Sequence, residues 1–124
     1  CAEHARQALE LGRTEAPVVH YEDMVVAQLF RRVRSRQELE RMAARILGPL
    51  LRPEHRELLD TLVCYVGSDC NAKRAASELF LHVNSMHNRL GRIERLLGRS
   101  LKDWEVIFDV MLALKMRDYL KQME

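Results

Sequence analysis

The sequence has few of the residues that a turn-rich or disulfide-stabilised fold needs. It contains 5 Gly, 3 Pro and 3 Cys in 124 residues. So few glycines and prolines argue against a sandwich or barrel joined by many tight turns. An odd and small number of cysteines argues against a disulfide framework and favours a reducing, cytoplasmic compartment. No apolar run approaches the ~18 residues of a membrane-spanning helix, so no membrane partner is expected.

The residues that are present are typical of a compact helical protein. Hydrophobic residues make up 48% of the chain and charged residues 31%, the composition of a packed chain rather than a disordered one. The net charge is only +2, but residues 71–102 carry seven basic residues against two acidic ones. Arginine outnumbers lysine 16 to 4, and arginine is the better partner for phosphates and base edges. Residues 71–102 are therefore a candidate nucleic-acid surface, with a solvated helix face as the alternative.

The pattern along the chain predicts three parts. The chain starts at Cys1 within a helical pattern, which we interpret as a fragment whose upstream part is missing. Residues 1–34 are interpreted as the remnant of an α/β domain, with a helix over 2–11, a β-prone run over 18–21 and a helix from 22 to about 33. Residues 35–52 are predicted to form a helical bridge, and residues 53–124 an all-α domain.

Capping residues and apolar spacing place the helices. Ser35 and Glu38 have the spacing of a capping box, and apolar residues then recur at helical intervals as far as Gly48. The next helix opens at Pro53 and runs to about residue 66. Asn71 is the expected N-cap of a short helix with small apolar residues, which would let another helix approach closely.

Two longer helices are expected after a break at residues 80–82. The first spans residues 83–97 and is closed by Gly98. The second runs from residue 103 to about 122 and is apolar almost all round as far as Leu114. Such a helix is expected to be wedged between other elements or subunits.

A helical wheel of residues 83–97 separates two faces. The apolar face consists of Val83, Met86, Leu90, Ile93 and Leu97. The opposite face and its flanks combine amides, a hydroxyl, a histidine and arginines and carry no acid: Asn84, Ser85, His87, Asn88, Arg89, Gly91, Arg92 and Arg95. Asn can pair with adenine, Arg with guanine, and Ser with phosphates or bases. A small-residue helix, a tight turn and such a helix together predict a helix-turn-helix.

The stretch from Asn71 to Gly98 resembles the C-terminal helix-turn-helix of bacterial purine-catabolism and sugar-diacid regulators (the PucR/CdaR type). The family pattern is approximately N-x-x-x-x-A-x-x-L-F-x-H-x-N-T-x-x-Y-R-L-x-R-I-E-x-L-L-G. This chain keeps fourteen of its residues, with Ser85 in place of the usual Thr: Asn71, Ala76, Leu79, Phe80, His82, Asn84, Arg89, Leu90, Arg92, Ile93, Glu94, Leu96, Leu97 and Gly98. VVHYEDM at 18–24 is similar to the end of the family's GGDEF-like α/β domain, and ILGPLL at 46–51 to the bridge that follows it.

The resemblance implies a mainly α fold, a Fis-like or homeodomain-like helix-turn-helix bundle after a small α/β remnant. It implies a cytoplasmic regulator of a catabolic operon that binds double-stranded DNA as a homodimer. A small-molecule effector would be bound by the missing N-terminal region, and no cofactor or metal is expected.

The helix over residues 83–97 is expected to enter the major groove through its N-terminal half. Lys73 and Arg74 are expected on the phosphate backbone, assisted by the positive end of the helix that they begin. The expected DNA-contacting residues are Asn71, Lys73, Arg74, Val83, Asn84, Ser85, His87, Asn88, Arg89 and Arg92.

Four positions of the helix over residues 83–97 depart from the family pattern: Val83, His87, Asn88 and Gly91. The family commonly has long basic or aromatic side chains at these positions. Each departure removes a potential contact with DNA, so weaker binding or an altered site sequence is expected. The alternative function is a degenerate helix-turn-helix that acts as a protein–protein or dimerisation module.

Zinc binding and catalysis find less support. Cys64, Cys70, His82 and His87 approach zinc-finger spacing, but the cysteines are too far apart and the segment between Cys70 and His82 is predicted to be helical. We interpret Cys64 as a buried thiol and His82 as a structural residue of the turn. The chain has no phosphate-cradling glycine loop and no nucleophile motif. The sequence therefore predicts a binding protein and not an enzyme.

Overall fold

The computed structural model describes residues 21–33 and 35–122, and this part of the chain is helical without a β-strand. Its elements are α2 (Tyr21–Arg31), α3 (Arg36–Leu47), the 3-10 turns η1 (Gly48–Leu51) and η2 (Pro53–His55), α4 (Arg56–Gly67), α5 (Ala72–Glu78), α6 (Val83–Leu97) and α7 (Trp104–Gln122). The mainly helical fold predicted from the sequence is confirmed.

The α/β remnant expected in residues 1–34 is not seen in the described part of the chain. The helix expected over 2–11 and most of the β-prone run lie outside the described residues. Tyr21, the last residue of that run, opens α2 instead of ending a strand. The division into residues 1–34, 35–52 and 53–124 stays a prediction.

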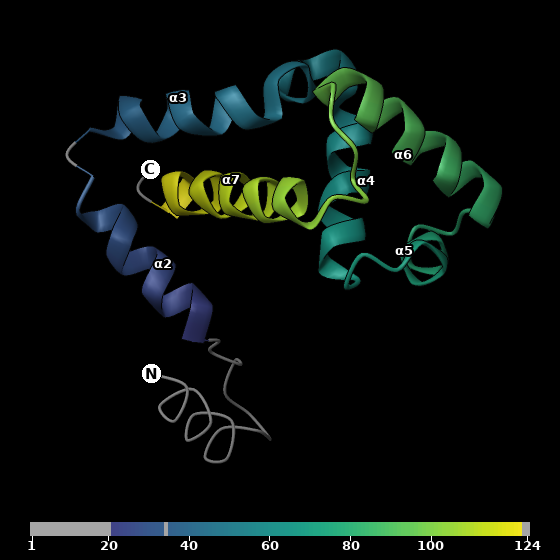
Figure 1. Cartoon of the computed structure of the whole chain (residues 1–124), viewed down its shortest axis with the longest axis horizontal. Helices are drawn as coiled ribbons and strands as arrows, with labels where there is room; N and C mark the ends of the chain where they lie inside the picture. The colour runs from purple at the N-terminus through teal and green to yellow at the C-terminus, as the bar shows by residue number, and fades with distance from the viewer. Residues whose placement is uncertain (1–20, 34, 123–124) are drawn as a thin grey trace.

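Figure 1 shows how the described helices are arranged. α4, α5 and α6 pack on one another as a three-helix unit. α3 and α7 lie side by side and run in opposite directions. α2 meets α7 near the C-terminal end of that helix, where the Phe30 and Tyr119 rings contact edge to face with centroids 5.5 Å apart.

Capping groups define the helix ends that the sequence predicted. Ser35 Oγ accepts a hydrogen bond from the Glu38 N–H at 3.4 Å before α3, and Asn71 Oδ1 accepts one from the Arg74 N–H at 3.1 Å before α5. Gly98 ends α6 with a φ of +68°, a left-handed conformation that glycine adopts without a steric penalty. Local sequence signals therefore fix where these elements start and stop.

The core lies where the α3–η1 corner meets α4 and α6. Five apolar side chains from these elements have no solvent exposure: Leu47, Leu50, Leu62, Met86 and Ile93. Leu90 is also buried, and Val83 and Leu97 are half-buried. The apolar face predicted for α6 is therefore the face that packs into the core, which turns the polar face of α6 outward.

α7 packs against α2, α3 and α4. Its buried residues face the rest of the molecule: Val106, Val110, Ala113, Leu114, Met116 and Leu120. Trp104, Phe108 and Met111 are exposed. The elements of the described chain cover only part of α7, because one side of its N-terminal half is exposed there. That another subunit covers this side stays a prediction.

Leu62→Ala should lower the free energy of unfolding by about 2–5 kcal/mol, because it deletes a fully buried side chain and leaves a cavity. Leu29 in α2 is exposed, so Leu29→Ala should cost less than about 1 kcal/mol. Urea unfolding followed by far-ultraviolet circular dichroism measures both variants. Equal losses for the two would contradict the core described for α4.

Candidate nucleic-acid interface

The start of α6 is fixed by His82. Its Nδ1 accepts a hydrogen bond from the Asn84 N–H at 3.1 Å, and its backbone is extended as an N-cap requires. This confirms that His82 is a structural residue of the turn. The cap leaves the side chains of Asn84 and Ser85 exposed at the first turn of the helix.

The outward face of α6 continues from this first turn. Asn88, Arg92 and Arg95 are exposed at helical intervals after Asn84. The acid of this helix, Glu94, is turned aside, because its carboxylate accepts a hydrogen bond from the Leu101 N–H at 2.7 Å. The outward face is therefore a row of amides and guanidinium groups without a competing carboxylate. Arg95 belongs to it, although it was not among the predicted contact residues.

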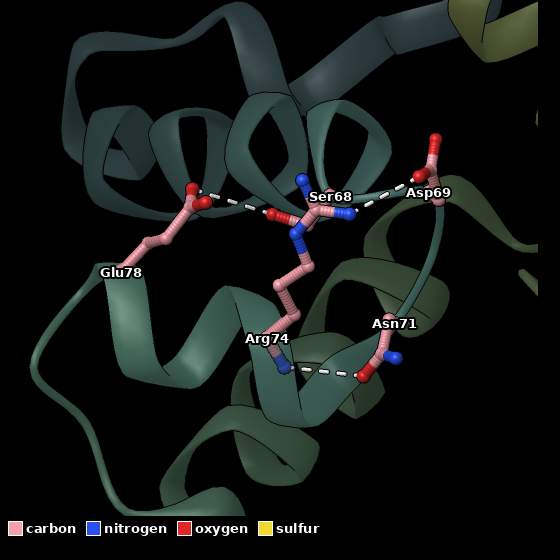
Figure 2. Close-up of polar contacts among 5 residues, drawn as sticks. All are labelled: Ser68, Asp69, Asn71, Arg74 and Glu78. Carbon is pink, nitrogen blue, oxygen red and sulfur yellow. Dashed lines mark hydrogen bonds and ion pairs between the residues drawn. The ribbon is translucent and has the colours of Figure 1, made fainter.

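α5 carries the other predicted basic residues beside α6. Its buried Ala75 and Ala76 face the unit, and small side chains let α6 pack closely. Lys73 and Arg74 are exposed at the first turn of α5. Figure 2 shows the guanidinium of Arg74 in an ion pair with the Asp69 carboxylate, at 3.2 Å. Lys73 and Arg74 are thus accessible on the side of the unit where the chain enters α5.

The turn before α5 is held by polar contacts of its own. Ser68 is fully buried and its Oγ donates a hydrogen bond to the Glu78 carboxylate at 3.3 Å, as Figure 2 shows. The side chain of Asn71, which was predicted to contact DNA, is engaged as the cap of α5. Asn71 therefore holds the short helix in place, and its exposed amide nitrogen remains on the outer side.

Arg89 is the predicted contact residue whose position differs most from expectation. Its guanidinium lies against α4, with one nitrogen 3.2 Å from the Glu57 carboxylate and the other 3.0 Å from Thr61 Oγ1. The Arg89 side chain is only 23% exposed. Thr61 in turn donates a hydrogen bond to the Glu57 carbonyl at 2.8 Å. These contacts join α6 to α4 and turn Arg89 away from the outward row.

The positions that depart from the family pattern are exposed or half-buried. His87 is exposed on one flank, and Val83 is half-buried at the helix start. A Cβ added at Gly91 would meet only the end of the flexible Arg95 side chain, at 3.8 Å. A longer side chain at Gly91 would therefore fit without rearranging the core.

The turn between α5 and α6 contains Phe80, which matches the family pattern but was not among the predicted contact residues. Phe80 has a φ of +57° and its side chain is 95% exposed. A non-glycine residue in this region costs roughly 1–2 kcal/mol. Sequence reasoning marked the break at this position, but the apolar residue type gave no sign of its exposure.

Two residues of the zinc hypothesis, Cys64 and His82, make other contacts. Cys64 Sγ lies 3.8 Å from the Ala75 carbonyl and 3.6 Å from the Glu78 carboxylate, and His82 caps α6. Burial raises the pKa of the thiols of Cys64 and Cys70, which disfavours the thiolate form that binds metal. Within residues 21–33 and 35–122, no three His, Cys, Asp or Glu side chains are grouped as a metal would require.

An uncovered polar helix, packed across a short helix of small residues, defines a helix-turn-helix domain. Comparison with known proteins agrees, since residues 58–116 match the family described as the PucR C-terminal helix-turn-helix domain. Residues 58–116 thus form a PucR-type C-terminal helix-turn-helix, and the resemblance seen in the sequence is confirmed.

Curated relatives come from Bacillus subtilis (strain 168). The purine catabolism regulatory protein is 33% identical over 118 residues, which cover 94% of this chain and 22% of the relative. The proline-responsive transcriptional activator PutR is 35% identical over 63 residues, 48% of this chain and 15% of the relative. The chain thus spans about a fifth or less of the length of these proteins. No solved structure gives a significant match.

No helix of the described part of the chain is long and apolar enough to cross a membrane.

Arg89→Ala should lower the free energy of unfolding by about 1–3 kcal/mol, because it leaves the buried Thr61 hydroxyl without its charged partner. Arg89→Lys should recover only part of this loss, since an ammonium group cannot reproduce the two-nitrogen contact. Chemical denaturation measures both, with Arg41→Ala on the exposed side of α3 as the control. Unfolding of Arg89→Ala at the wild-type midpoint would show that Arg89 does not join α6 to α4.

Proposed function

We propose that this chain is the DNA-binding part of a bacterial transcription regulator, with α6 in the major groove of a specific operator. The observation that carries the proposal is the outward row of α6. Asn84, Asn88 and Arg92 are exposed side by side on a helix whose other face is locked in the core. Amide side chains read base edges in the major groove, and a guanidinium beside them can hold a phosphate.

The other basic residues fit a supporting role on the phosphate backbone. Lys73 and Arg74 lie exposed at the start of α5, as the first helix of a helix-turn-helix crosses the backbone. Ser85 and His87 flank the row and add donors toward phosphates. We assign Arg89 the task of holding α6 on α4, because a phosphate contact would require it to leave Glu57 and Thr61.

The relatives, and the fact that dimers usually read operators, support the remaining parts of the proposal. The relatives' names refer to purine catabolism and to proline response, which supports control of a catabolic operon here. Regulators of this kind read operators as dimers, so we propose a homodimer that acts in the cytoplasm. A region outside this chain would bind the small-molecule effector, since the chain matches only 22% of the purine catabolism regulatory protein.

A protein–protein module is the competing function. Its support is the set of departures at Val83, His87, Asn88 and Gly91, which remove side chains that could reach DNA. The same positions remain open to solvent or at the helix start and carry no apolar patch for a protein partner. DNA binding is therefore the better account of this surface, and the measurements below separate the two.

Asn84→Ala should weaken binding to the cognate promoter by about 1–3 kcal/mol and change binding to random DNA little, because a base-edge contact carries sequence information. Fluorescence anisotropy with duplexes covering the promoter beside the gene, and with scrambled duplexes, measures the difference. Gln37→Ala is the matched control, since it removes an exposed amide from α3. Equal binding of both variants and wild type to the promoter would favour the protein–protein module.

We expect the Arg92 guanidinium to neutralise a phosphate, so Arg92→Ala should weaken binding to promoter and random DNA alike. The slope of log K against log salt should then decrease in magnitude by about one unit, since one fewer counterion is released. Gly91→Arg, which adds a cation at an open position, should change the slope by a similar amount in the opposite direction. Slopes that stay the same in both variants would show that this part of α6 does not face the backbone.

A further inference from the structure

The outward side of α7 is apolar over its N-terminal half. Trp104 is 72% exposed, Phe108 57% and Met111 39%. They follow one another at intervals of four and three residues, so they form one stripe along the helix. The Trp104 and Phe108 rings meet edge to face with centroids 6.4 Å apart, which holds the indole in a defined position. Large exposed apolar patches of this kind mark interaction sites.

A cleft opens on the same side of α7 near its C-terminal end. It has a volume of about 310 Å³ and lies between α7 and α2. Its walls come from Val26, Ala27, Phe30, Lys115, Asp118, Tyr119 and Gln122. At ~100° per residue, Lys115 and Gln122 lie within about 20° of Trp104 around the helix. The exposed indole and the cleft therefore share one face, separated along α7 by about 16 Å.

We propose that this face of α7 binds the same face of a second copy, with Trp104 of each chain in the α2–α7 cleft of the other. The inference rests on the proposed homodimer and names its surface. A two-fold dimer needs one patch that is complementary to itself. This face of α7 has the exposed Trp104 indole at one end and the cleft at the other, so it meets this need. Two antiparallel copies of α7 place the Trp104 side chain of each copy opposite the cleft of the other.

The spacing of the side chains fits this register. With the two-fold axis midway between Phe108 and Met111, Trp104 lies opposite position 115 of the other copy, at the cleft. Phe108 then lies opposite Met111 of the other copy, a favourable sulfur–aromatic pair. Lys102 falls opposite position 117 of the other copy, where the adjacent Asp118 is exposed and Arg117 is half-buried. Opposite charges at the two ends of the stripe therefore favour the antiparallel arrangement.

A second groove on the molecule is a poorer place for another copy. It lies between α4 and α7 and has cations on its rim at Arg52, Arg56, Arg117 and Lys121, against Asp60 and Asp118. Two copies of such a basic groove would repel each other. The α7 stripe carries charges of both signs at its ends and has no such penalty.

The exposed area of the stripe determines how tightly the dimer is expected to bind. Judged from the area of such side chains, Trp104, Phe108 and Met111 expose roughly 400 Å² per copy. With the cleft walls, the pair reaches the lower end of specific interfaces, at about 1,200 Å² in total. The dimer should therefore dissociate at micromolar concentrations and be reinforced by an operator with two half-sites.

Sedimentation equilibrium and tryptophan fluorescence of the 124-residue chain test the proposal. Trp104 is the sole tryptophan, so its emission should shift to shorter wavelength as the dimer forms. Trp104→Ala should weaken self-association about thirtyfold or more, as truncation of a central aromatic anchor does. Ala27→Phe, which fills the cleft, should weaken it too and leave the Trp104 emission unshifted. Phe80→Ala is the matched control, because it removes an exposed aromatic far from α7 in sequence and should leave the dimer unchanged.

Three results would overturn the proposal: a monomer up to submillimolar concentration, a dimer that survives Trp104→Ala, or a dimer in which Trp104 emits as it does in the monomer. Fluorescence anisotropy with a duplex that holds one half of the operator measures DNA binding independently of dimerisation. It therefore distinguishes failure of the dimer surface from failure of the proposed function. Trp104→Ala should bind that duplex within about twofold of wild type, since α7 lies outside the α6 row. A chain that dimerises through α7 but binds no DNA would support the surface and refute the regulator.

Discussion

The burial of one face of α6 is the constraint on which the interface depends. Met86 and Ile93 have no solvent exposure and meet Leu62 of α4 and Leu50 of η1 in the same core. Rotating α6 by one residue would bury a guanidinium or an amide and expose a leucine or an isoleucine, at a cost of several kcal/mol. The core therefore decides which side chains face solvent. Asn84, Asn88 and Arg92 form a row because the opposite face cannot leave the core.

Polar contacts add to this packing and also shape the charge of the surface. Glu94 turns to the Leu101 N–H, Glu78 to Ser68 and Glu57 to Arg89. Each acid of the unit that lies near α5 or α6 is thus used to tie two segments together. Among the basic residues of 71–102, Arg74 pairs with Asp69 and Arg99 with Asp109, whereas Lys73, Arg92 and Arg95 have no carboxylate of the described residues at ion-pair distance. A positive surface results from a chain whose net charge is close to zero.

Much of the fold could be predicted from the sequence because its signals are local. Ser35, Asn71 and Gly98 act within one turn of the helices that they cap, and the apolar spacing of α6 identifies its buried face. Arg89 could not be placed in this way, since its partners Glu57 and Thr61 are 32 and 28 residues away along the chain. The exposed side of α7 could not be predicted either, because a helix that is apolar all round does not show which side packs against the core. The strand expected at residues 18–21 depended on a four-residue pattern. Tyr21, the last of these residues, is the first residue of α2.

Amide chemical-shift mapping tests the central claim most directly, because it reports which helix meets DNA without any substitution. The labelled 124-residue chain would be titrated with duplex DNA covering the promoter beside the gene. The account predicts the largest changes at Asn84, Ser85 and Asn88 and at the start of α5, with smaller changes along the remaining outward row of α6. Changes confined to α2 and α7, with α6 unmoved at saturation, would contradict it.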